Sequence, residues 1–253
     1  MKTSQEQRRS FDRSFEILQS VSEYGPLTVA ELEKRVLLPR STLYRLLQGL
    51  RRRELVFLDP NGMLRLGVGI IRLANNLHRQ HPLPSVAKPA LTDLTEATGE
   101  TSLLTVVEWP YAVCIHRVEP QQRMHISFEI GARRPLYAGA TAKVLLAYSG
   151  AAQIAEYLRV TRFEQFTDRT PTDPQEILLQ LAQVREQGYC YTESELDPGV
   201  AGLSVPLLDR DGGLIAGVSL VGPVGRLNVA MVRVHLAAAA DRIRKEVLDQ
   251  PTI

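Results

Sequence analysis

Residues 25–53 read GPLTVAELEKRVLLPRSTLYRLLQGLRRR and contain two short helical patterns separated by a proline. Thr28 and Glu31 have the spacing of a capping box, in which a hydroxyl and a carboxylate satisfy backbone N–H groups at the start of a helix. Pro39 predicts a break, because proline disfavours a helical conformation of the preceding residue. Beyond it, leucines recur at the spacing of one helical face and predict a helix over residues 40–53. These leucines are Leu43, Leu46, Leu47 and Leu50.

The flanking residues extend this pattern into a small domain. Upstream, apolar residues at helical spacing predict a helix over residues 8–24 that ends at Gly25-Pro26. Downstream, residues 55–58 and 63–66 have the composition of strands, and Asn61-Gly62 between them favours the primed turn of a β-hairpin. Three helices and a hairpin predict a winged helix-turn-helix. The alternative is a small helical domain that serves packing alone.

The last helix of this unit has the properties of a DNA-reading helix. An α-helix fits the major groove of B-DNA, and side chains at its N-terminus reach the base edges. Arginine can bridge O6 and N7 of guanine, while hydroxyl groups can contact bases or phosphates. Arg65, in the second strand of the hairpin, is a candidate phosphate contact. The predicted DNA-binding residues are Arg40, Ser41, Thr42, Tyr44, Arg45 and Arg65.

Charge is distributed unevenly along the 253 residues, although the formal net charge is only +2. Residues 1–80 carry 14 Lys and Arg against 8 Asp and Glu, whereas residues 81–253 carry 16 against 20. A basic unit therefore precedes an acidic one, as expected for binding of a polyanion, although a solvated basic face gives the same counts. We expect no membrane span and no secretory signal, hence a cytoplasmic protein. The two cysteines, Cys114 and Cys190, lack metal-site spacing and are expected to be buried small hydrophobic residues.

The rest of the chain predicts a helix and then a mixed α/β unit. Residues 67–80 have apolar positions at helical spacing, so this helix can join two domains and pair with its copy in a second chain. A sheet covered by helices can enclose a concave pocket. The predicted strands are 101–107, 112–118, 125–129, 200–208 and 214–221, and the predicted helices are 141–148, 151–158, 174–187 and 228–248.

The chain resembles the IclR family of bacterial transcriptional regulators through motifs that follow one another across both halves. The resemblance implies an α+β fold with a winged helix-turn-helix DNA-binding domain over residues 1–66 and a linker helix over 67–80. It also implies a GAF-like α/β domain over 81–253 that binds an effector and oligomerises, to a homodimer or a dimer of dimers. The motifs are FDRSFEIL (11–18), GPLTVAEL (25–32), LPRSTLYRLL (38–47), LRLG (64–67), TGET (98–101), PLYA (135–138), KVLLA (143–147), REQGY (185–189), ELDPGV (195–200) and SLVGP (219–223) with Arg226-Leu227.

An effector site between the sheet and the loop 137–141 is also implied by the resemblance. This chain has Thr192, Gly202 and Val221 where many members have an acidic residue, a cysteine and a serine. The pocket is therefore predicted to have lost polar anchors and one negative charge relative to those members, and we expect an effector larger or more apolar than a two- or three-carbon acid, such as an aromatic acid or a related metabolite. An unpaired polar group would cost about 1–3 kcal/mol. The alternative is sequence drift in a pocket that still binds a small acid or nothing. The predicted effector-binding residues are Ala140, Thr141, Thr192, Gly202, Ser219 and Val221.

Together these features predict a ligand-responsive, sequence-specific DNA-binding regulator, either repressor or activator, of a catabolic or metabolic operon. The expected partners are operator DNA, a small organic acid and further copies of the chain, with no cofactor, metal or membrane. We expect no enzymatic activity, since the GVSLVG segment at 217–222 lacks the spacing of a nucleophile elbow. The alternative is a metabolite-binding module or enzyme without operator binding.

Overall fold

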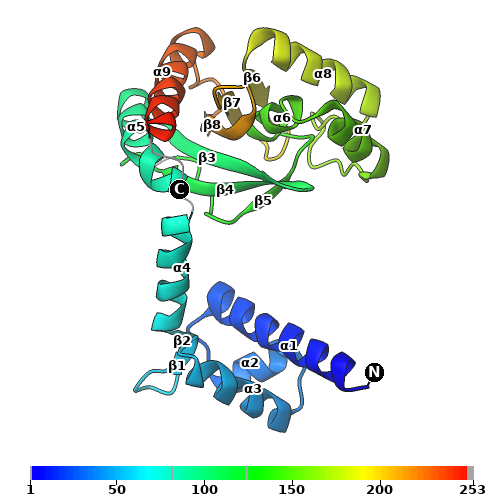
Figure 1. Ribbon diagram of the computed structural model, residues 1–253, viewed down its shortest axis with the longest axis vertical. Helices are drawn as coiled ribbons and strands as arrows, with labels where there is room; N and C mark the ends of the chain where they lie inside the picture. Colours follow the sequence, from blue (N-terminus) through cyan, green and yellow to red (C-terminus); the bar gives the residue numbers. More distant parts are fainter. Residues whose placement is uncertain (1, 81, 123–124, 250–253) are drawn as a thin grey trace. The chain divides into compact units, whose positions relative to one another are not determined.

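The computed structural model describes residues 2–80, 82–122 and 125–249. The chain divides into two compact units, Met1–His81 and Pro82–Ile253 (Figure 1). Each unit has a hydrophobic core of its own. No helix within these ranges is both long enough and apolar enough to cross a membrane.

The first unit is a helical domain with a small hairpin. Helices α1 (Lys2–Tyr24), α2 (Val29–Val36) and α3 (Arg40–Arg52) pack around aliphatic side chains that include the predicted leucines of α3. The predicted capping box is present: the Glu31 N–H donates to Thr28 Oγ1 at 3.2 Å, and the Thr28 N–H donates to Glu31 Oε2 at 2.8 Å. Strands β1 (Val56–Leu58) and β2 (Leu64–Leu66) follow as an antiparallel pair, and then α4 (Val68–Gln80).

The turn of this hairpin differs from the predicted primed turn. Both primed turns need a positive φ at the first central residue, but only Gly62, with a φ of 77°, has one, and Asn61 does not. Instead, the Gly62 N–H donates to the Asp59 carbonyl, and Asp59 Oδ1 accepts from the N–H groups of Asn61 and Met63. The Asp59 side chain thus organises a longer loop, which the Asn-Gly pair alone did not reveal.

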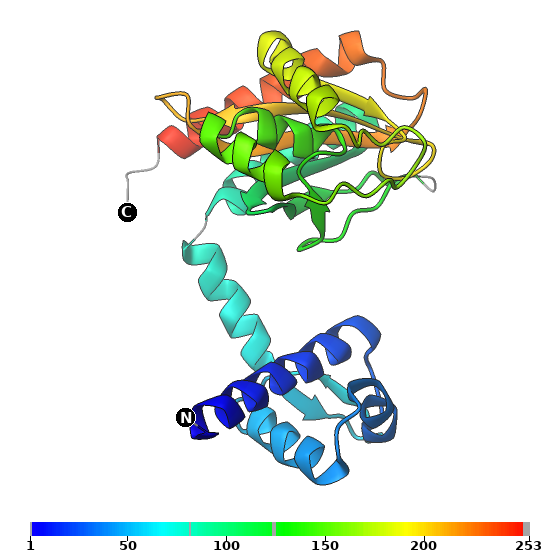
Figure 2. The same cartoon turned by 90° about the vertical axis from the view of Figure 1, so that its right-hand side faces the viewer.

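The second unit is an antiparallel sheet with helices on both faces, as Figure 1 and Figure 2 show. The elements are α5 (Leu83–Thr98), β3 (Thr101–Glu108), β4 (Tyr111–Val118), β5 (Arg133–Pro135), α6 (Ala140–Ala147), α7 (Ala151–Val160), α8 (Pro174–Gln187), β6 (Cys190–Glu193), β7 (Val200–Leu208), β8 (Leu214–Pro223) and α9 (Val229–Leu248). The strand order is β5-β4-β3-β8-β7-β6. Aliphatic residues on one face pack against α5 and α9, and the other face carries α6, which packs with α7 and α8. The α+β fold is therefore confirmed.

The predicted strand over residues 125–129 is wrong. Ile126 and Phe128 pack their side chains onto Leu103, Cys114 and Val221 on the face of the sheet, so this segment does not extend its edge. The edge strand is β5 instead, a few residues further on. A segment of alternating polar and apolar residues has the same pattern whether it pairs with an edge or covers a face, because the pattern does not specify hydrogen-bond partners.

Three elements had no counterpart in the sequence prediction: α5, β5 and β6, all within the described residues. Pro84 and Pro89 obscured α5, although Pro84 lies in the first helical turn, where its missing N–H has no intrahelical partner. The signal for α5 was the buried series Ala87, Ala90, Leu91 and Leu94, which has the spacing of one helical face. Strands β5 and β6 are too short to show a pattern of alternation.

Candidate functional site

The N-terminal half of α3 presents a polar surface. Leu43, Leu46 and Leu47 are buried, which turns the intervening residues outward. The Arg40 guanidinium lies 5.7 Å from the centroid of the Tyr44 ring, so the first turn carries a cation next to an aromatic hydroxyl. Of the predicted DNA-binding residues in this helix, Arg40, Ser41, Tyr44 and Arg45 are exposed, and Thr42 is half-buried.

Arg65 lies on β2 of the hairpin and is already paired. Its Nε donates to Asp59 Oδ2 at 2.8 Å. This hydrogen bond, together with those from backbone N–H groups of the turn, holds the pKa of Asp59 below its ordinary value. The Arg65 side chain is still 48% exposed, so it can meet an anion without leaving Asp59.

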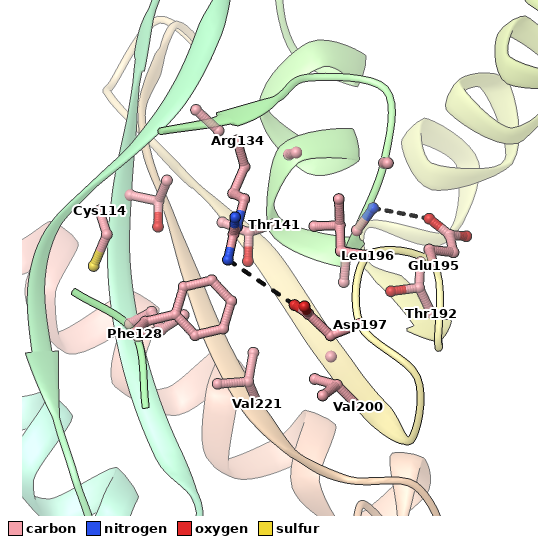
Figure 3. Close-up of a pocket in the computed structure, with 18 of the residues that line it drawn as sticks. Cys114, Phe128, Arg134, Thr141, Thr192, Glu195, Leu196, Asp197, Val200 and Val221 are labelled. Atoms are coloured by element: carbon pink, nitrogen blue, oxygen red, sulfur yellow. Dashed lines mark hydrogen bonds and ion pairs between the residues drawn. The ribbon is translucent and has the colours of Figure 1, made fainter. Parts of the chain in front are cut away.

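A cavity opens on the face of the sheet that carries α6 (Figure 3). Thr192 on β6 is opposite Gly202 on β7, and Gly202 is opposite Val221 on β8, so the register aligns these three residues across neighbouring strands. Ala140 and Thr141, at the start of α6, complete the same wall. Gly202 keeps this space open, because a Cβ there would lie 3.3 Å from the Cβ of Ala140. The lining residues include Ala140, Thr141, Thr192, Gly202 and Val221 of the predicted set.

Ser219 is on the same face of β8 but does not line the cavity. It is fully buried beneath Thr141, whose hydroxyl donates to Ser219 Oγ at 2.7 Å. Ser219 Oγ in turn donates to Ser204 Oγ at 2.8 Å. Its hydroxyl is thus engaged on both sides within the protein, and its observed role is to orient Thr141.

A buried ion pair connects α6 to the loop 194–199. The Lys143 side chain, only 3% exposed, donates to Glu195 Oε1 and, at 2.8 Å, to Gln180 Oε1. Glu195 Oε2 accepts a 2.8 Å hydrogen bond from the Gly139 N–H. Gly139 has a φ of 84°, and a Cβ there would come within 2.8 Å of Leu196. These contacts hold the loop 194–199 against the start of α6 and shape one side of the cavity.

Sequence reasoning missed Arg134, Phe128 and Asp197, which also line the cavity (Figure 3). Arg134 forms a 4.0 Å ion pair with Asp197, and its guanidinium lies 5.5 Å from the centroid of the Phe128 ring. Beside the positions where the sequence predicts lost polar anchors, the lining thus contains charged groups that the prediction did not include, since Asp197 and Glu195 both bring carboxylates to it. Glu195 and Asp197 both lie in the motif ELDPGV, which is part of the family resemblance but by itself implied no role for either residue.

Both cysteines are buried, as predicted. Burial raises the pKa of the Cys114 thiol to about 11 and that of the Cys190 thiol to about 12. Both therefore remain protonated near neutral pH and are unsuited to act as nucleophiles. Among the described residues, no cluster of His, Cys, Asp and Glu side chains has the arrangement needed to hold a metal ion.

A winged helix-turn-helix followed by an α/β unit with a cavity defines a DNA-binding transcriptional regulator with a ligand-binding domain. Residues 10–60 match the family model of the IclR helix-turn-helix domain, and residues 75–245 match that of the bacterial transcriptional regulator IclR C-terminal domain. The chain belongs to the IclR family of bacterial transcriptional regulators. These families and the relatives below are regulators rather than enzymes, in agreement with the sequence prediction.

Curated relatives match over most of their length. The chain is 30% identical to the transcriptional regulator BhcR of Paracoccus denitrificans, over 93% of this chain and 83% of that one. It is also 30% identical to KdgR of Escherichia coli, over 91% and 88%.

Solved structures share the fold. IclR of Thermotoga maritima has a TM-score of 0.83 at 24% identity, over 95% of this chain and 99% of that chain. An IclR homologue of Microbacterium hydrocarbonoxydans complexed with 4-hydroxybenzoate has a TM-score of 0.85 at 23% identity, over 94% and 98%.

Proposed function

We propose that the protein binds operator DNA through residues 1–66 and that a small organic acid, bound by residues 81–253, changes its affinity for that DNA. The helix over 67–80 links the two and pairs with its copy in a homodimer or a dimer of dimers. In this proposal the protein works in the cytoplasm, without a cofactor, as repressor or activator of a catabolic or metabolic operon.

The DNA-binding half of the proposal rests on α3. Its inward leucines place Arg40, Ser41, Tyr44 and Arg45 on the solvent side, at the helical end that enters the major groove in winged helix-turn-helix proteins. Arg65 on the hairpin adds a cation for the phosphate backbone. The contribution of Arg65 is expected to be independent of base sequence.

The dimeric state is proposed from α4. Its apolar side chains are exposed to solvent, and apolar residues repeated along one helix are an ordinary site for pairing with a second helix. A dimer would present two copies of α3 and therefore require a pseudo-palindromic operator. The exposed residues are Val68, Ile71, Leu73 and Leu77.

The effector-binding half rests on the cavity, and this observation carries the proposal. Residues from all six strands of the sheet and a helix N-terminus converge on one apolar space with a few polar groups, the usual composition of a small-molecule site. The IclR homologue of Microbacterium hydrocarbonoxydans, which shares this fold, was solved with 4-hydroxybenzoate, and this supports aromatic acids as one class of effector for the present chain.

A titration of the full chain on DNA from upstream of its own gene tests the proposal. We expect saturable binding that weakens steeply with salt and exceeds binding to unrelated DNA of equal length. Benzoate and isovalerate serve as probe acids for the change in affinity. Binding of both DNAs alike would overturn the operator assignment, and chemical conversion of a probe acid would favour an enzyme instead.

A further inference from the structure

Arg134 is placed by the pleat of β5 with its side chain at the cavity. Successive residues of a strand point to opposite faces, so Arg133 and Arg134 have different surroundings. Arg133 donates to Glu108 Oε1 at 2.9 Å and lies 5.8 Å from the Tyr111 ring, and it does not line the cavity. Arg134 pairs in register with Ala112, another lining residue. One strand therefore supplies both the candidate ligand-binding arginine and a matched neighbour.

The partners of Arg134 leave most of its hydrogen-bonding capacity for a ligand. A guanidinium group has five N–H donors. Its ion pair with Asp197 is long at 4.0 Å, and the two side chains are 45% and 54% exposed. Exposed pairs of this kind contribute little to stability, so an incoming anion can displace Asp197 easily. Phe128 meanwhile holds the guanidinium against its ring (Figure 3).

The remaining charges at the cavity narrow the class of anion. Among the described lining residues, Arg134 is the one positively charged side chain. The other nearby cation, Lys143, already forms an ion pair with Glu195. A dianion such as phosphate or a dicarboxylate would therefore face one available cation, Arg134, beside the carboxylate of Asp197, while Lys143 and Glu195 neutralise each other. A single carboxylate matches the planar guanidinium fork and the charge available.

We propose that Arg134 binds the carboxylate of a monocarboxylate effector, displacing Asp197, while the apolar part of the effector lies against Phe128, Leu103 and Val221. This inference rests on the proposed function, in which the cavity is the effector site. Loss of the Asp197 pair also removes a link between β5 and the loop 194–199, which is held to the start of α6 by Glu195. Arg134 is thus both the specificity-determining residue and the point where binding reaches that loop.

Calorimetric titration of the full chain without DNA tests the proposal. The probes are benzoate and isovalerate, their uncharged amides benzamide and isovaleramide, and inorganic phosphate. We expect both acids to bind more tightly than their amides and than phosphate. Arg134→Met keeps the apolar stem and should weaken the acids by about 10- to 100-fold, as loss of charge-assisted hydrogen bonds predicts. Arg133→Met should leave acid binding unchanged.

The substitution Asp197→Asn should change the affinity for the probe acids in the opposite direction to Arg134→Met. Removal of the competing carboxylate should strengthen binding of the acids several-fold and leave the amides unaffected. Thermal unfolding of each variant checks that the fold is retained.

Equal acid affinity in Arg134→Met and wild type would overturn the assignment and place the carboxylate elsewhere, for example at the start of α6. Amides that bind as tightly as acids, tighter binding of phosphate, or an absence of acid binding at millimolar concentration would overturn it as well. Because these titrations contain no DNA, a failure of operator binding is detected separately.

Discussion

The ion pair of Lys143 with Glu195 shows how one residue controls the shape of the cavity. Both side chains are almost completely buried, at 3% and 11% exposure, and Glu195 also accepts from the Gly139 N–H. A buried charge is tolerated when it is paired and hydrogen-bonded, and becomes costly when its partner is removed.

Lys143→Met is therefore expected to destabilise the second unit by about 3–5 kcal/mol, because it leaves the Glu195 carboxylate buried without a counter-ion. The double variant Lys143→Met with Glu195→Gln should recover part of this loss. The chain has a single tryptophan, Trp109, and it lies in the second unit. Urea unfolding followed by its fluorescence measures the change, and equal stability of Lys143→Met and wild type would show that the pair is not needed.

Helix α3 combines an inward face of leucines with an outward face of polar residues. The leucines stabilise the first unit by packing in its core, whereas the polar side chains on the outward face are not part of that core. Substitutions on the outward face should therefore separate DNA binding from folding.

Arg40→Ala and Arg45→Ala are each expected to cost about 1–3 kcal/mol of operator affinity, if each arginine contacts a base. Arg159→Ala on α7 removes the same charge from an exposed i,i+3 pair in the other unit and is the control. Electrophoretic titration and circular dichroism measure affinity and folding. Undiminished operator affinity in both α3 variants would contradict the assignment of α3 as the reading helix.

The hairpin should contribute differently from α3. Arg65→Ala is expected to weaken operator and unrelated DNA alike and to reduce the salt dependence by about one unit of slope, as for loss of one phosphate contact. Its pairing with Asp59 in the free protein will moderate the loss. Titrations at several salt concentrations measure the slope. A loss confined to the operator would instead identify Arg65 as a base-reading residue.

In the proposed function, a ligand bound by one unit changes DNA binding by the other. A ligand shifts an equilibrium only to the extent that it binds the two states with different affinity. Typical couplings of about 1–3 kcal/mol correspond to changes of about 5- to 150-fold in affinity. We propose that the helix over 67–80 and the geometry of the dimer carry this coupling.

Filling the cavity should remove the ligand response while operator binding is retained. Gly202→Leu does so directly, but its side chain also crowds Ala140 at the start of α6. Val200→Trp is the second variant, because Val200 lines the cavity at its half-buried edge and leaves the centre of the sheet unchanged. Operator titration with and without benzoate measures the response. If both folded variants respond like the wild type, the effector binds elsewhere.

The sequence predicts structural features that depend on neighbouring residues better than it predicts features that depend on distant ones. Leucine spacing, the Thr28–Glu31 pair and the strand patterns of 200–208 and 214–221 depend on neighbours along the chain, so most helices and strands were predicted correctly. The segment over 125–129 was wrongly predicted as a strand because packing partners far along the sequence determine its place, and α5 was missed because Pro84 and Pro89 obscured its helical spacing. Within the cavity, Thr192, Gly202 and Val221 were identified through family resemblance, and the register of β6, β7 and β8 explains why they meet.

Periodicity, caps and ordered motifs are properties of the chain, and they were sufficient to predict the winged helix-turn-helix, the α/β character of the second unit and the IclR family. Only the tertiary structure revealed that Ser219 is engaged beneath Thr141, that Asp59 pairs with Arg65 and that Arg134, Phe128 and Asp197 meet at the cavity. The reason is physical. Charged and polar side chains acquire their partners through strand register and loop placement, whether the two residues are six positions apart, as Asp59 and Arg65 are, or far apart, as Arg134 and Asp197 are, and no local pattern records which partners they will find.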